Sequence, residues 1–149
     1  MSNEELIKLA IEAREFAYVP YSKFAVGAAL LTKSGKLYSG CNIENAAYGP
    51  SNCAERTAIF KAVSEGEKTI KAIAICGGSK EEIDDMAYPC GICRQVMREF
   101  SNPQDLKVII ARSVSDYKVF TLEEALELCA LPRTLGLLGG EDVSVGSGR

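Results

Sequence analysis

Two short cysteine-containing stretches constrain this chain more than any other feature of its sequence. They read CAER at 53–56 and PCGIC at 89–93, and each opens a segment with helical patterning. Together they offer three thiols and one carboxylate, which is the donor set of a zinc site that keeps one position open for water. We therefore expect the fold to bring both stretches to one place.

The spacing of these residues indicates how they can meet. Cys90 and Cys93 are three apart, so both face one side of a first helical turn and can hold a single metal. Cys53 and Glu55 are two apart, so they converge only if Cys53 stands at the very start of its helix. The sequence thus predicts that two helix N-termini face one metal. The partial positive charge of these N-termini offsets the formal charge of about −1 on a zinc trithiolate.

Two arginines follow the cysteines at helical spacing. Arg56 is three residues beyond Cys53, and Arg94 is four beyond Cys90, so each can return to the first ligand of its helix. Our hypothesis is that both donate hydrogen bonds to the thiolates and withdraw charge from them. The alternative is that they form ordinary surface ion pairs.

Composition excludes several other classes of protein. At 149 residues the chain is most simply one domain, and its net charge of −3 argues against a binder of the phosphate backbone. Histidine is absent, so a zinc ion must be bound by sulfur or carboxylate, and proton transfer falls to other side chains. No apolar run has the length of a membrane span and no signal peptide is recognisable, which predicts a cytoplasmic protein.

The remaining cysteines, at positions 41, 76 and 129, lie in apolar settings. There a free cysteine usually acts as a small hydrophobic residue, although each is a conceivable fourth ligand of a closed structural site. With three ligands and an adjacent glutamate, an open catalytic site is the favoured interpretation.

Hydrophobic periodicity predicts helices alternating with strands after an initial hairpin. The fold class is therefore α/β, a three-layer α/β/α arrangement with a mixed five-stranded sheet. We expect one domain over residues 1–131 and a Gly/Ser-rich, poorly ordered tail over 132–149. The expected helices cover 3–18, 53–65, 90–100 and 122–128, and the strands cover 25–32, 37–42, 70–76, 106–111 and 117–120.

The loop after the second strand has the character of a binding segment. Asn42 and Glu44 are two apart, so in extended backbone they point to the same side, where an amide and a carboxylate suit a vicinal diol. The alternative is a solvated turn with local side-chain–backbone bonds. Phe24, just before the first strand, is either a core residue or an aromatic wall for a flat heterocycle.

Three motifs carry a resemblance to a known family. NIENAAY at 42–48, CAERTA at 53–58 and PCGICRQV at 89–96 resemble, in this order, the small homotetrameric zinc cytidine deaminases of the three-cysteine type. The similarity covers roughly residues 5–128. It implies deamination of cytidine and 2′-deoxycytidine to the uridine nucleosides plus ammonia, in pyrimidine salvage, with one zinc ion per subunit.

The resemblance also implies roles for individual residues. Zinc held by three cysteines would activate water to attack C4 of the base, with Glu55 moving the protons. Asn42 and Glu44 would bind the ribose hydroxyls. Phe24 would pack on the face of the pyrimidine, and the backbone of Ala54 would contact the edge of the base. Tyr48 would reach the site of a neighbouring subunit, and the zinc ligands would be Cys53, Cys90 and Cys93.

The sequence departs from the family pattern near its end, and two rival readings remain. Members of the family usually carry an aromatic residue after a Leu-Pro step, but Leu131-Pro132 is followed by no aromatic residue, which affects the expected substrate affinity. One rival is a related zinc deaminase acting on a base-modified nucleoside or a nucleic acid. The other is a structural zinc or redox-switch protein, in which Glu55 would be dispensable.

Overall fold

A computed structural model of the chain describes residues 1–83 and 86–125. Its order of elements begins with a helix and a hairpin and continues with alternating helices and strands, as the periodicity predicts. The elements are α1 (Asn3–Arg14), β1 (Phe24–Thr32), β2 (Leu37–Cys41), α2 (Ala54–Ser64), β3 (Ile70–Ser79), α3 (Gly91–Glu99), β4 (Lys107–Ser113) and β5 (Asp116–Thr121).

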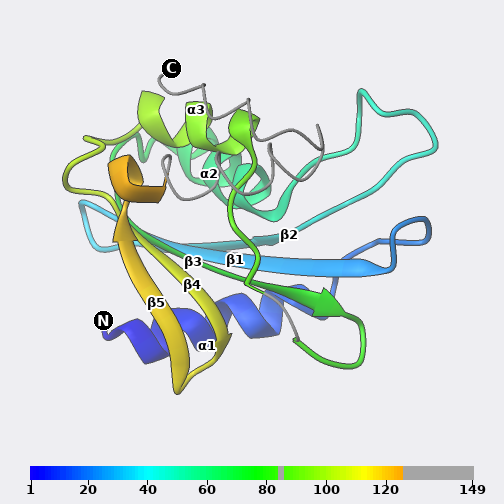
Figure 1. The fold of residues 1–149 in the computed structure, drawn as a ribbon. Coiled ribbons are helices and arrows are strands. Elements are labelled where there is room, and N and C mark those ends of the chain that lie inside the picture. Colours follow the sequence, from blue (N-terminus) through cyan, green and yellow to red (C-terminus); the bar gives the residue numbers. More distant parts are fainter. Residues whose placement is uncertain (84–85, 126–149) are drawn as a thin grey trace, which may run out of the picture.

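The sheet has five strands in the order β2-β1-β3-β4-β5. Strand β1 is antiparallel to both of its neighbours, β3 and β4 are parallel, and β5 returns antiparallel to β4. Helix α1 covers one face, whereas α2 and α3 cover the other (Figure 1). The predicted three-layer α/β/α arrangement around a mixed sheet is therefore confirmed.

The two faces of the sheet bury side chains of different size. Successive strand residues point to opposite faces, so β3 and β4 contribute to two separate cores. Large aliphatic residues of these strands lie under α2 and α3, and mostly small ones lie under α1. The first set is Ile73, Ile75, Val108 and Ile110, and the second is Ala72, Ala74, Cys76, Ile109 and Ala111.

Two strand glycines let helices approach the sheet closely. A Cβ on Gly27 of β1 would collide with the carbonyl oxygen of Ala10 in α1. A Cβ on Gly40 of β2 would lie 2.7 Å from the backbone nitrogen of Ala58 in α2. The contact with Gly40 sets the distance between α2 and the sheet. Since α2 begins at the first cysteine stretch, it also sets the position of that stretch.

Strand β3 is longer than predicted. The predicted strand covers 70–76, whereas Gly77-Gly78-Ser79 continue it and pair with the start of β1. The pairing is Phe24 with Ser79, Ala25 with Gly78, and Val26 with Gly77. Gly77 is needed for close packing here, because a Cβ would lie 2.8 Å from Ala87 Cβ and 3.0 Å from Phe24 Cε2.

Helix α1 is shorter than predicted and ends at Arg14 instead of residue 18. After Arg14, the amides of Phe16 and Ala17 donate to the carbonyl oxygens three residues earlier. The amide of Tyr18 donates instead to the carbonyl oxygen of Asn42, in the loop after β2. The helix does not continue to residue 18, and the Phe16 side chain is 81% exposed. At the other end Ser2 caps the helix through a capping box with Glu5.

The last described segment begins a further helix. Residues 122–125 are helical, and Thr121 and Glu124 form a reciprocal cap. The predicted end of this helix at residue 128, Cys129, the domain boundary at 131 and the tail 132–149 lie outside the described residues. Within the described ranges no helix is both long and apolar enough to cross a bilayer.

We predict that Gly40→Ala lowers the melting temperature by several degrees, because overpacking of this kind costs about 1–3 kcal/mol. Gly49→Ala is the matched control, since a Cβ there meets nothing within 4 Å. Thermal unfolding followed by circular dichroism measures both. Equal melting temperatures for the two variants would contradict the close contact between α2 and β2.

Candidate metal centre

Both cysteine stretches stand at helix N-termini. Cys53 is the N-cap of α2 and Cys90 is the N-cap of α3, each with extended backbone, and Cys93 follows in the first turn of α3. Cys53 therefore begins its helix, as convergence with Glu55 requires. The free backbone N–H groups of two helices point toward one region, which favours negative charge there.

The three sulfur atoms form a compact cluster. Cys53 Sγ lies 3.8 Å from Cys90 Sγ, and Cys90 Sγ lies 3.4 Å from Cys93 Sγ. All three sulfurs lie within 4.8 Å of one another. Tetrahedral zinc with Zn–S bonds of about 2.3 Å separates its sulfur ligands by about 3.8 Å, so the cluster fits one zinc ion.

The pKa values of the cluster also indicate a site for a cation. Hydrogen bonding with Cys53 and Cys93 lowers the pKa of Cys90, whose sulfur also accepts from the Cys93 amide at 3.4 Å. Hydrogen bonding with Cys53 and Cys90 raises the pKa of Cys93. Three thiolates cannot coexist at this spacing without compensation, and a thiophilic dication supplies it.

Glu55 lies in the first turn of α2, beside the sulfur cluster. Its side chain is 4% exposed, and burial raises its pKa to about 7. A carboxyl group with this pKa can both accept and release a proton near neutral pH. The site therefore combines a soft metal-binding cluster with a proton carrier.

The two predicted arginines lie at the site. Arg56 Nη2 donates to Cys53 Sγ at 3.3 Å, and although burial opposes the charge, hydrogen bonds to Cys53 and Cys93 raise the pKa of the guanidinium. Arg94 lines the same cleft, with its guanidinium near Gly91 at the start of α3. Charge withdrawal from the thiolates by these arginines stays a prediction.

A cleft of about 920 Å³ opens over the cluster. Its walls come from the start of β1, the loop after β2, the start of α2 and the segment before α3. Every predicted substrate-contacting residue lies on it, whereas Cys93 is buried beneath. The predicted set is Phe24, Asn42, Glu44, Tyr48 and Ala54.

Asn42 and Glu44 bond the backbone that leads into β1. The Asn42 side chain accepts from Val26 N and donates to Phe24 O, both at 2.9 Å, which leaves one amide hydrogen for a ligand. Glu44 Oε1 accepts from the amides of Tyr21 and Ser22 at 3.0 and 3.1 Å. Hydrogen bonding by Ser22 lowers the pKa of Glu44, so its side chain is a carboxylate that can accept further hydrogen bonds.

Phe24 lies on the cleft side of the sheet. A Cβ on Gly77 would come within 3.0 Å of the ring atom Cε2 and 2.8 Å of Ala87 Cβ, so the absence of a side chain at Gly77 makes room for the ring. Sequence reasoning missed the cleft residues 86–88, although the strand glycines were a signal for close packing in this area. Tyr88 there packs on Phe120, with ring centroids 6.1 Å apart.

Tyr48 differs from the other cleft residues in its exposure. It lies on the loop between β2 and α2 and is 99% exposed, although it also lines the cleft. Its ring is therefore available to a molecule outside this chain.

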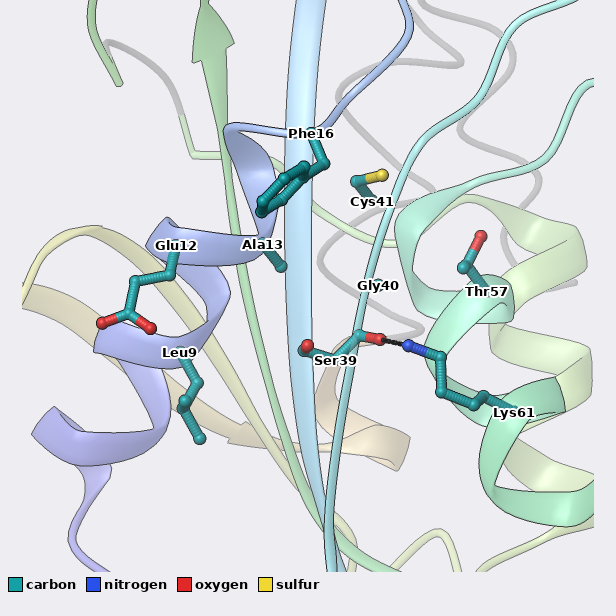
Figure 2. Close-up of a pocket in the computed structure, with 9 residues that line it drawn as sticks. All are labelled: Leu9, Glu12, Ala13, Phe16, Ser39, Gly40, Cys41, Thr57 and Lys61. Carbon is teal, nitrogen blue, oxygen red and sulfur yellow. Dashed lines mark hydrogen bonds between the residues drawn. The ribbon is translucent and has the colours of Figure 1, made fainter. Parts of the chain in front are cut away.

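A second hollow lies between α1, the edge strand β2 and α2 (Figure 2). Lys61 Nζ donates to the Ser39 carbonyl at its rim, at 2.6 Å, and Cys41 is the one thiol among its lining residues. Burial raises the pKa of Cys41, so it is protonated at neutral pH and provides no nucleophile. Among the described residues, the sulfur cluster and the buried glutamate both lie at the larger cleft.

Comparisons with known proteins agree with this geometry. The family described as "Cytidine and deoxycytidylate deaminase zinc-binding region" matches residues 1–110. The chain is 52% identical, over 126 residues, to cytidine deaminase of Halalkalibacterium halodurans, covering 85% of this chain and 92% of that protein.

Solved structures give the same result. Cytidine deaminase from Burkholderia pseudomallei superposes with a TM-score of 0.75 at 46% identity, covering 84% of this chain and 96% of that one. Cytidine deaminase from Mycobacterium tuberculosis gives a TM-score of 0.71 at 34% identity, with coverage of 85% and 94%.

We predict that Arg56→Gln weakens zinc binding about 10- to 100-fold, because it removes the hydrogen bond to Cys53 Sγ. Competition with a chromophoric chelator measures the affinity. Arg98→Gln, at an exposed position near the end of α3, is the control and leaves the affinity unchanged. Unchanged zinc content and turnover in Arg56→Gln would remove the proposed role of this arginine.

Proposed function

Because the chain belongs to the cytidine deaminase family, we propose that it hydrolyses cytidine and 2′-deoxycytidine to uridine and 2′-deoxyuridine, releasing ammonia. The observation that carries this proposal is the buried carboxyl group of Glu55 beside a cluster of three cysteine sulfurs at the base of a cleft. The cluster supplies a metal site, and the carboxyl supplies a proton carrier.

The reaction needs an activated water and a group that carries protons to the base. Zinc, when bound by the three cysteines, supplies the activation of water for attack on C4. Glu55 takes a proton from this water, delivers one to N3 and passes one to the departing ammonia. Its pKa of about 7 allows it to alternate between these states.

Substrate binding falls to side chains that are already fixed by the backbone. Asn42 retains an amide hydrogen and Glu44 a carboxylate for the ribose hydroxyls, while Phe24 forms a flat wall for the pyrimidine. The backbone of Ala54, in the first turn of α2, contacts the base. Since Asn42 also bonds Phe24 O, the ribose site and the aromatic wall are mechanically linked.

We also propose that four copies of the chain assemble and share their sites. Tyr48 lines the cleft yet is 99% exposed, which suits a ring that reaches into a neighbouring subunit. Ile92, at the start of α3, is 61% exposed and is a further apolar side chain available for contact with another chain. The enzyme would act in the cytoplasm, on free nucleosides in pyrimidine salvage.

We predict that Glu55→Gln lowers cytidine turnover at least 100-fold, because Glu44, the other carboxyl group among the described residues that line the cleft, is bonded to the amides of Tyr21 and Ser22. Loss of the ultraviolet absorbance of the 4-amino base measures turnover, with and without a zinc chelator. Metal analysis gives one zinc per subunit in both proteins, and Glu12→Gln on α1 is an exposed control. Full turnover by zinc-loaded Glu55→Gln would instead favour a structural zinc protein.

The shared site predicts complementation between two defective variants. Tyr48→Ala and Glu55→Gln are each impaired alone, but mixed subunits regain activity because one chain supplies Glu55 and its neighbour supplies Tyr48.

We expect light scattering to give a particle of four times the chain mass of 16.1 kDa. A particle of 16.1 kDa, or no recovery on mixing refolded subunits, would contradict the shared site.

A further inference from the structure

Arg14, the last residue of α1, is buried on the face of the sheet opposite the cleft. Its side chain is 4% exposed, so its guanidinium needs hydrogen-bond partners to offset the loss of water. Nε donates to the Ala25 carbonyl at 3.1 Å. Nη2 donates to the carbonyls of Ser79 and of Glu82, the latter at 2.9 Å. One side chain thus joins three backbone carbonyls from two separate segments.

These carbonyls belong to the backbone that forms the cleft. Ala25 is in the first residues of β1, next to Phe24, and Phe24 pairs with Ser79 at the end of β3. Glu82 lies just beyond β3, in the segment that leads toward the second cysteine stretch. Arg14 therefore fixes the beginning of β1 against the end of β3.

Close packing transmits this restraint to the other side of the sheet. Gly27 has no side chain, and a Cβ there would lie 2.7 Å from Arg14 N, so the end of α1 rests directly on β1. On the cleft side the Phe24 ring lies against Gly77 with similarly little room. A displacement of the first residues of β1 must therefore move the ring, because neither contact can absorb it.

We propose that Arg14 is a positioning residue for substrate binding, which holds Phe24 in place by clamping the carbonyls of Ala25 and Ser79. This role rests on the proposed function, since the aromatic wall is where the pyrimidine packs. The planar fork of a guanidinium reaches several acceptors at once, whereas a lysine ammonium keeps the charge and reaches fewer. Arg14 itself touches no substrate.

The kinetic test compares Arg14→Met with a matched variant, Ile7→Ala, which removes buried volume from the same helix. Arg14→Met raises KM for cytidine about tenfold or more, while kcat changes little and zinc stays at one per subunit. Arg14→Lys recovers part of the loss. Ile7→Ala lowers the melting temperature but leaves KM unchanged.

A second measurement does not depend on the reaction. Hydrogen exchange detected by mass spectrometry, on the zinc-loaded proteins, reports the amides of residues 24–27 and 76–79. Arg14→Met accelerates exchange in both segments, and Ile7→Ala does not do so selectively. Unchanged exchange, or faster exchange with an unchanged KM, would overturn the positioning role. If the parent protein fails to deaminate cytidine, the proposed function is wrong. The hydrogen-exchange rates alone then show whether Arg14 holds the start of β1 against the end of β3.

Discussion

The convergence of two helix N-termini on three sulfur atoms is the constraint on which the rest of the structure depends. Thiols at separations of 3.8 and 3.4 Å cannot all ionise without a cation, and a zinc trithiolate carries excess negative charge. The N-termini of α2 and α3, together with the Arg56 guanidinium, place positive charge where it is needed. The same convergence brings Glu55 out of water and next to the metal site.

The sheet holds the two helices at the required height. Glycine at position 40 of β2 allows α2 to rest on the backbone, while large aliphatic residues of β3 and β4 fill the space beneath α2 and α3. On the opposite face small residues and Gly27 bring α1 close enough for Arg14 to reach the strand ends. The cleft is thus supported from both sides, with the reactive groups on one face and the clamp on the other.

Local patterning was sufficient to predict the layers, the five strands and the meeting of the cysteine stretches, because helical and strand periods and the ligand spacing are properties of neighbouring residues. It was insufficient where long-range contacts decide the outcome. The glycines at 77 and 78 belong to a strand because Phe24 packs on one of them. Arg14 ends its helix and points inward because carbonyls 11 and 65 residues away need its donors. The spacing of Asn42 and Glu44 indicates a diol-binding pair and the family resemblance implies the same, whereas a role for Tyr48 follows from the resemblance alone. The structure gives the location of all three on the cleft.

The reaction depends on one zinc ion held by three sulfurs, with a fourth position open for water. X-ray absorption spectroscopy of the zinc-loaded protein tests it most directly, because sulfur and oxygen ligands differ in distance and in scattering. We predict three sulfur ligands at about 2.3 Å and one oxygen ligand at about 2.0–2.2 Å. A first shell of four sulfurs would contradict it, because a closed site has no position for the reacting water.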